Sequence, residues 1–231
     1  MADFTGQTVL ITGASGGLGK TVTRQFLDAG AAVAAVARSW PGEAEQDGRL
    51  KRLCADLSDP EGAREAVAGA LAVNGRIDVL LHLAGGFAGG EPVWKTEDET
   101  WTQMMAVNLN AAFYVFRSVL PHMLEARRGR IIAVGSRTVE QPASGLSAYG
   151  VAKAGLHTLV RTVALEVKTQ GITVNAVLPS VIDTAANREA MSSADFSKWV
   201  QPASIGRLLL WLASAEAGDV SGALIPIYGR A

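Results

Sequence analysis

The chain has 231 residues, of which 48% are hydrophobic and 19% are charged, a balance typical of a globular protein and not of a disordered or fibrous one. Its formal net charge of -1 and its pI of about 6.3 give no electrostatic basis for binding nucleic acid or an anionic membrane surface. No apolar run approaches the roughly 18 residues that a membrane helix needs, and residues 1–6 lack the features of a signal peptide. We therefore expect a cytoplasmic protein.

The single cysteine, Cys54, bears on both compartment and packing. One cysteine cannot form an internal disulfide, which fits a reducing compartment. Because Cys54 lies in a predicted strand, we expect it to be buried as a small hydrophobic side chain and not to act as a reactive thiol.

Apolar runs alternate with helical patterns along the whole chain, and this alternation predicts βαβ units and a parallel sheet. In the first half, Asp59 and Pro60 predict the cap and first turn of a helix that reaches about residue 74. An earlier helix is predicted at 17–29, and the predicted strands are 9–12, 32–37, 51–55 and 79–83. Since the second of these strands is apolar throughout, we expect a sheet covered on both faces.

The second half continues the same alternation and ends in a helix and a short strand. Helices are predicted at about 97–106, 109–126, 147–169 and 202–213, strands at 131–135, 173–178 and 223–227, and an irregular segment at 180–199. No internal linker or repeat interrupts the pattern. We therefore expect residues 1–231 to form a single α/β domain.

A glycine-rich stretch follows the first predicted strand and leads directly into a helix. Glycines let the backbone turn sharply and approach a pyrophosphate, while the helix N-terminus offers unpaired N–H donors. A tight turn that serves only packing is the alternative, because glycine is used there too. In this strand–loop–helix context we favour nucleotide binding, and the predicted contacts are Gly13, Ser15, Gly16, Gly17, Leu18 and Gly19.

The residues after the second predicted strand bear on cofactor choice. An acidic residue there binds the ribose 2′-hydroxyl of NAD, whereas a basic residue accommodates the 2′-phosphate of NADP. Here Arg38 and Ser39 follow the strand, and neither is acidic. The alternative is an arginine that only points into solvent. The sequence therefore favours NADP(H), with NAD(H) still possible.

A tyrosine and a lysine share one face of the predicted helix 147–169. Tyr149 and Lys153 are four residues apart, so the phenol and the ammonium can meet one small ligand. Acid–base duty near pH 7 requires the pKa of a tyrosine to fall by about 3 units, or roughly 4 kcal/mol. One cation about 4 Å away supplies that amount at an effective dielectric of about 20. A chance match is the alternative, since one such pair is a weak motif.

Two further polar residues fall where one fold needs them, Asn108 between two predicted helices and Ser136 after a predicted strand. With this set, the sequence resembles the short-chain dehydrogenase/reductase family along almost its entire length. The resemblance rests on residues 12–19, Asp56, Leu57, Ala84, Gly85, Asn108, Ser136, Tyr149, Lys153 and residues 179–184. It implies a Rossmann-type, doubly wound parallel sheet of about seven strands with helices on both faces. It also implies hydride transfer without a metal.

The resemblance further implies a role for each of these residues. Tyr149 would donate a proton to the oxygen of a small-molecule substrate, and Ser136 would hydrogen-bond the same oxygen. Lys153 would hold the nicotinamide ribose and lower the pKa of Tyr149, while Asn108 would hold a water in a proton relay toward Lys153. The other implied cofactor contacts are Asp56 and Leu57 at the adenine, Ala84 and Gly85 at the adenosine ribose, and Pro179, Ile182 and Thr184 near the nicotinamide and phosphates.

The resemblance also implies a homodimer or homotetramer, with helices 109–126 and 147–169 forming a two-fold interface. The second of these helices has more apolar residues than one face needs against a sheet.

Several positions depart from the family pattern. His82 and Leu83 replace two asparagines, for which we expect only an effect on the stability of that strand end, and His82 is interpreted as an interior histidine. Ser180 replaces a glycine in the loop expected beside the nicotinamide. Gly16 replaces a basic residue found in some NADP-using members, so Arg38 would act without a second cation.

Residues 84–90 and 178–199 are similar to one branch of the family, the dihydropteridine reductases. That branch lacks the catalytic serine and ends its second strand with an acid for NADH, whereas this chain has Ser136 and Arg38. A dihydropteridine-reductase-like enzyme, an isomerase or epimerase, and a non-catalytic NADP(H)-sensing regulator therefore stay open as alternatives.

Four large side chains are candidates for the walls of a substrate cleft: Phe87, Trp94, Leu146 and Trp199. Apolar walls would suit a planar or ring-bearing molecule. The alternative is that these residues pack in the core or at an oligomer contact.

Overall fold

The computed structural model describes residues 2–40 and 47–230. Its seven strands form one sheet in which every neighbouring pair is parallel, in the order β3-β2-β1-β4-β5-β6-β7. The strands are β1 (Thr8–Thr12), β2 (Ala32–Ala37), β3 (Leu50–Cys54), β4 (Val79–His82), β5 (Gly129–Val134), β6 (Ile172–Pro179) and β7 (Leu224–Ile227). The strand order reverses direction between β1 and β4, and α/β sheets bind ligands beyond the carboxyl ends of the strands at such a point.

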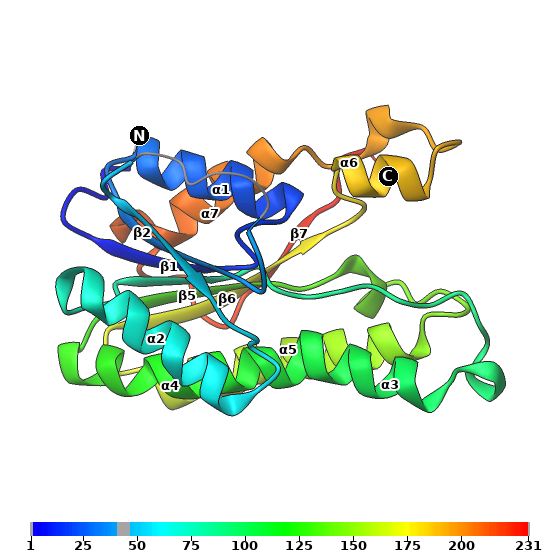
Figure 1. The fold of residues 1–231 in the computed structure, drawn as a ribbon, viewed down its shortest axis with the longest axis horizontal. Helices are drawn as coiled ribbons and strands as arrows, with labels where there is room; N and C mark the ends of the chain where they lie inside the picture. The colour runs from blue at the N-terminus through cyan, green and yellow to red at the C-terminus, as the bar shows by residue number, and fades with distance from the viewer. Residues whose placement is uncertain (1, 41–46, 231) are drawn as a thin grey trace.

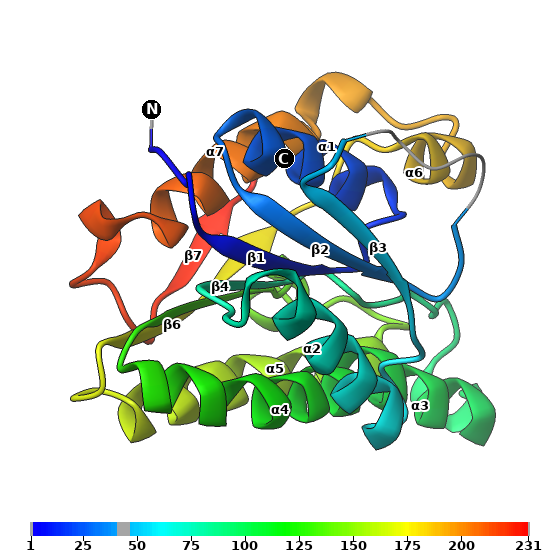
Figure 2. The same ribbon diagram turned by 60° about the vertical axis from the view of Figure 1, so that its left-hand side comes forward.

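Helices cover both faces of the sheet, as Figure 1 and Figure 2 show. One face carries α1 (Gly17–Asp28) and α7 (Pro202–Ala213), and the other carries α2 (Pro60–Asn74), α4 (Ala111–Ala126) and α5 (Ser147–Glu166). Two shorter helices, α3 (Asp98–Met105) and α6 (Ala185–Ala190), lie toward the edge where the strands end. The predicted Rossmann-type fold is therefore confirmed.

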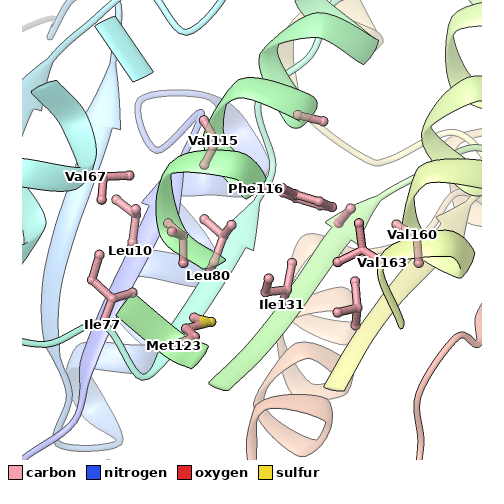
Figure 3. Packing of buried hydrophobic residues seen from close by; sticks show 14 of the residues in the cluster. Leu10, Val67, Ile77, Leu80, Val115, Phe116, Met123, Ile131, Val160 and Val163 are labelled. Atoms are coloured by element: carbon pink, nitrogen blue, oxygen red, sulfur yellow. The ribbon is translucent and has the colours of Figure 1, made fainter. Parts of the chain in front are cut away.

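Along each apolar strand, alternate side chains pack against the helices on opposite faces of the sheet. Leu10, Leu80 and Ile131 pack with the layer of α2, α4 and α5, as seen from close by in Figure 3. Val9 and Ile11 point the other way, into the cluster beneath α1 and α7. Each such fully buried side chain contributes about 1.5–3 kcal/mol. The period of two along a strand explains why β2 is apolar at every position.

Most predicted boundaries are within two residues of the structure, and α2 has the expected Asp59 cap, whose carboxylate accepts from the Gly62 N–H at 3.0 Å. Three segments differ more. A π-helical turn at Ala106–Asn110 precedes α4, helix α5 ends at Glu166, and the segment predicted to be irregular contains α6 and a short turn at Phe196–Lys198. The other single turns are Val93–Lys95, Arg137–Val139 and Ala215–Ala217.

Cys54 was expected to be buried, and that expectation is wrong: its side chain is exposed. Strand β3 lies at the edge of the sheet and pairs only with β2. No residue of this strand is fully buried, because one side of an edge strand lacks a neighbour. Among the helices of residues 2–40 and 47–230, none is long and apolar enough to cross a membrane.

Candidate active site

A cavity of about 600 Å³ lies beyond the carboxyl ends of β1, β2, β3, β4 and β5. Its lining includes most of the predicted cofactor contacts: Gly13, Ser15, Gly16, Gly17, Leu18, Gly19, Arg38, Ser39, Asp56, Leu57, Ala84, Gly85 and Ile182. These residues are scattered over much of the chain, and the parallel strands bring them together because every strand ends at the same edge.

The glycine loop between β1 and α1 packs so closely against other backbone segments that side chains would clash at two of its positions. Gly13 has φ +68, and a Cβ atom there would lie 2.8 Å from the backbone nitrogen of Ala84. A Cβ atom on Gly19 would lie 2.2 Å from the carbonyl oxygen of Gly13. Gly16 caps α1 without any side-chain hydrogen bond, so the first N–H groups of the helix face the cavity unblocked. This cradle fits the pyrophosphate of a dinucleotide.

Arg38 and Asp56 lie on the part of the cavity formed after β2 and β3. Hydrogen bonds from Ser58 lower the pKa of Asp56, and the charge of Arg38 lowers it further. The Arg38 side chain is exposed and has no ion pair with any residue that the structure describes. Its guanidinium is therefore available to an anionic group in the cavity.

Tyr149 and Lys153 occupy successive turns of α5, as their spacing predicts. The Nζ atom of Lys153 lies 5.9 Å from the centre of the Tyr149 ring and donates a 2.9 Å hydrogen bond to the carbonyl oxygen of Val134. Burial lowers the pKa of Lys153 to about 8. Burial also raises the pKa of Tyr149, and a hydrogen bond with Ser136 opposes that rise.

Lys153 was expected to lower the pKa of Tyr149, but in this structure the pKa of the tyrosine is raised. Two physical reasons account for the opposite sign. Burial of the phenol penalises the phenolate, and the buried ammonium is directed at a backbone carbonyl and not at the phenol oxygen. The protonated phenol is thus the favoured form at neutral pH.

Ser136 follows β5, and its side chain lowers the pKa of the Tyr149 phenol. Its hydroxyl oxygen also accepts from the backbone N–H of Thr138 at 3.2 Å and lies 3.1 Å from the Thr138 hydroxyl. The hydroxyl therefore caps the turn Arg137–Val139. This cap holds Ser136 at the end of the strand, next to the phenol.

Asn108 is fully buried in the π-helical turn and binds the loop after β4. Its Nδ2 atom donates to the carbonyl oxygens of Gly86 at 3.0 Å and Met104 at 3.1 Å, and its Oδ1 atom accepts from the Gly86 N–H at 3.2 Å. A Cβ atom on Gly85 would lie 2.8 Å from Asn108 Oδ1 and 3.4 Å from Lys153 Nζ. Only a glycine fits where these two side chains converge.

Four predicted cofactor contacts do not line the cavity directly: Tyr149, Lys153, Pro179 and Thr184. Pro179 is the buried last residue of β6. Thr184 caps α6 by accepting from the Asn187 N–H at 3.3 Å, and its side chain packs against the backbone at Gly17. Thr184 therefore contacts the glycine loop, whereas Pro179 lies within the sheet, paired with Ile227 of β7.

Of the four candidates for the substrate cleft, Phe87 fits best. It lines the cavity, is 67% exposed, and its ring lies 5.1 Å from that of Tyr149, edge to face. Leu146 packs against the backbone at Gly89 in the same loop region. Trp94 is 80% exposed and does not line the cavity, while Trp199 is buried beside Phe196 with ring centres 4.7 Å apart. Trp199 therefore packs in the interior, and the place of Trp94 in a cleft stays a prediction.

Four cavity residues from α3 and the turns after it were not predicted: Gln103, Met104, Val107 and Ala111. Their helical spacing from one another was the available signal. Gln103, Val107 and Ala111 are four residues apart and Met104 is three before Val107, so the four lie on one helical face.

His82 is interior, as interpreted, and its Nδ1 atom lies 3.1 Å from the Thr12 hydroxyl. Its Nε2 atom has no hydrogen-bond partner among the described residues. Burial lowers the pKa of His82 to about 3, so the ring stays neutral. Among the described residues, no cluster of His, Cys, Asp or Glu could hold a metal ion.

Residues 7–195 match the short chain dehydrogenase family. This chain belongs to that family. It is 30% identical over 236 residues to a 3-oxoacyl-[acyl-carrier-protein] reductase of Vibrio cholerae, covering 97% of this chain and 96% of that protein. It is 33% identical to a galactitol 2-dehydrogenase of Rhizobium johnstonii, covering 96% and 93%. The structure of ElxO with NADP bound is similar at a TM-score of 0.90 and 23% identity, covering 99% of this chain and 98% of that one. The protein is a short-chain dehydrogenase/reductase-type oxidoreductase.

Proposed function

We propose that this oxidoreductase acts on a carbonyl, hydroxyl or quinonoid group of a small molecule, prefers NADP(H), and uses Tyr149 as its acid–base group. The observation that carries the proposal is the position of Tyr149, whose ring lies 5.1 Å from that of the cavity-lining Phe87 and whose pKa is lowered by Ser136 against the effect of burial. The bound nicotinamide would supply or accept the hydride. The residues that would hold it are the glycine loop, the Arg38 and Asp56 region, and the loop after β4.

The raised pKa of Tyr149 suits the reductive direction. A phenol that stays protonated at neutral pH can hydrogen-bond a substrate oxygen and donate its proton as negative charge develops there. Ser136 would donate a second hydrogen bond to the same oxygen. Lys153 would contact the ribose side of the cofactor, and Asn108 would support the relay of protons toward Lys153. In the oxidative direction the proton would move the opposite way, from the substrate hydroxyl to the tyrosine.

Arg38 supports the preference for NADP(H). A charge-assisted contact between its guanidinium and a 2′-phosphate is worth about 1.5–3 kcal/mol, and no carboxylate of a described residue pairs with it. ElxO, which shares the fold, binds NADP. Asp56 stands near Arg38 and works against a phosphate, but its carboxylate is directed to Ser58.

The substrate class follows from Phe87 and from the names of the relatives. Phe87 offers an apolar, aromatic wall directly beside Tyr149, which suits a substrate with a planar or apolar group next to its reactive oxygen. The relatives named above act on a 3-oxoacyl thioester and on a polyol. A quinonoid dihydropterin is the second candidate, because residues 84–90 resemble the dihydropteridine reductases.

The test is a screen of NADPH and NADH consumption against 3-oxoacyl thioesters, aldehydes, ketones, quinones and a quinonoid dihydropterin, with identification of each product. The Tyr149→Phe variant runs beside the unmodified enzyme as a matched control. Product formation that requires Tyr149 supports the proposal. Cofactor binding with no turnover of any class would favour the sensing regulator, and substrate change without net cofactor consumption would favour the isomerase or epimerase.

We also propose that residues 1–231 act as a single cofactor-binding and catalytic domain in a homodimer or homotetramer. Exposed apolar side chains on the outer faces of α4 and α5 support the assembly, namely Phe113, Leu124, Val151 and Leu165. Light scattering at micromolar concentration tests it, and a monomer would contradict it. A cytoplasmic location remains a prediction from composition.

A further inference from the structure

A second buried side chain lies on the same helix face as Tyr149 and Lys153. His157 follows Lys153 by four residues, so it is the next residue along that face of α5. Its side chain is 3% exposed. Its imidazole reaches the end of β5, where a 3.3 Å hydrogen bond joins the backbone N–H of Ser136 to His157 Nε2.

The direction of this hydrogen bond determines the state of the imidazole. A backbone N–H can only donate, so Nε2 must be the unprotonated nitrogen, and a neutral ring then carries its proton on Nδ1. Burial, together with the charges of Lys153 and Arg161, lowers the pKa of His157 to about 4. The ring therefore remains a neutral acceptor throughout the physiological range.

The other ring nitrogen shows that this arrangement has a cost. Nδ1 of His157 is buried and has no hydrogen-bond partner among the described residues. A buried donor without an acceptor is unfavourable, and an aliphatic side chain would fill the same space without that cost. A histidine here is therefore explained by what its Nε2 atom does for Ser136.

Gly135 lets the ring approach the strand this closely. A Cβ atom at this position would lie 2.4 Å from His157 Nε2 and 2.6 Å from Leu178 Cδ2. The Gly135 N–H makes the last ladder bond to β6, through the carbonyl oxygen of Val177 at 2.9 Å. The next N–H along the chain, that of Ser136, turns away from this ladder and is satisfied by His157.

We propose that His157 is a positioning residue, whose Nε2 atom holds the Ser136 backbone so that the Ser136 hydroxyl faces Tyr149 and the substrate oxygen. Ser136 is fixed at two points, by His157 through its N–H and by Thr138 through its hydroxyl. The inference rests on the proposed function of Ser136. It adds a residue that does not itself touch the reacting atoms.

A double-mutant cycle tests the inference with the enzyme's best substrate from the screen. We expect His157→Leu, which removes the acceptor, to lower kcat by about tenfold, since small misplacements in an active site have effects of this order. The dissociation constant of NADPH should stay within about twofold. His157→Gln can present an oxygen acceptor near the position of Nε2, and we expect it to recover most of the loss. In a Ser136→Ala background, His157→Leu should cost less than about twofold.

The outcomes separate this inference from the proposed function. If Ser136→Ala lowers kcat while His157→Leu does not, or if the two losses multiply, the positioning role is wrong and the role of Ser136 stands. If Ser136→Ala has no effect, the proposed role of the serine fails first. The protonation state of the ring, read by imidazole ¹⁵N NMR of the unmodified protein, needs no activity. A proton on Nε2 of His157 would overturn the inference even if every variant failed to fold.

Discussion

The ring of Phe87 meets the ring of Tyr149 edge to face, with ring centres 5.1 Å apart. Phe87 comes from the loop after β4 and Tyr149 from α5, so two distant segments together form the wall beside the acid. The phenylalanine is also 67% exposed on the cavity side. It therefore covers one side of the phenol while leaving apolar surface free for a substrate.

Replacing Phe87 with alanine tests this wall. We expect KM for ring-bearing or long apolar substrates to rise by about tenfold, because an aromatic contact with the substrate worth roughly 1.5 kcal/mol is lost. Small carbonyl substrates should change much less. Steady-state kinetics on a matched pair of substrates measures the difference, and Trp94→Ala, outside the cavity, is the control. Equal losses for small and large substrates would argue against a wall.

Tyr149→Phe removes the proposed acid and keeps the ring. General acid catalysis typically contributes about 10²–10⁴, so we expect turnover to fall by at least about a hundredfold. NADPH affinity, measured by fluorescence titration, should change little because the ring still packs against Phe87. Tyr114→Phe on α4 is the matched control and should keep full turnover. A Tyr149→Phe variant with undiminished turnover would remove the tyrosine from the mechanism.

The pH dependence of kcat/KM for NADPH should reflect the ionisation of Lys153 and not that of Tyr149. Burial lowers the pKa of Lys153 to about 8, whereas the pKa of Tyr149 is raised from 10.0. The ammonium is lost as the pH rises through about 8, so kcat/KM for NADPH, which reflects free-enzyme groups, should fall there. The Lys153→Met variant should have a low kcat/KM for NADPH that does not fall further through about pH 8. A decline in the unmodified enzyme that began only near pH 10 would contradict the assignment.

The same lowered pKa makes a prediction about stability. Between about pH 8 and 10.5 the folded protein has released the Lys153 proton while the unfolded chain still holds it. Because the unfolded state binds more protons in this window, the contribution of Lys153 to stability rises with pH there. Below about pH 8 both states hold the proton, and this contribution is constant. Denaturant titrations at about pH 7.5 and 9.5, on either side of the Lys153 pKa, measure the free energy of unfolding. The change in this free energy between the two pH values is then compared between the unmodified protein and Lys153→Met.

Arg38→Ala addresses cofactor choice. Loss of the contact between Arg38 and the 2′-phosphate, worth about 1.5–3 kcal/mol, lowers affinity roughly ten- to a hundredfold. This loss should affect NADPH and not NADH. We therefore expect kcat/KM for NADPH to exceed that for NADH by about tenfold in the unmodified enzyme and the gap to close in the variant. Arg207→Ala on α7 is the control. Equal use of both cofactors by the unmodified enzyme would mean that Arg38 only faces solvent.

Features that depend on neighbours in the chain could be predicted from the sequence. The apolar strands, the Asp59 cap of α2 and the glycine turn into α1 follow from local propensity and periodicity. Tyr149 and Lys153 share a face because an α-helix places residues four apart side by side. Because parallel strands all end at one edge of the sheet, the location of the cavity could also be predicted.

Features that depend on distant segments were decided only by the tertiary structure. Burial reversed the expected direction of the Tyr149 pKa. The edge position of β3 exposed Cys54, and packing against Phe196 buried Trp199. The contact between His157 and the Ser136 N–H joins residues 21 positions apart. The common reason is that burial and hydrogen-bond pairing arise where separate elements pack together. The periodicity within one element does not determine which other elements it will contact.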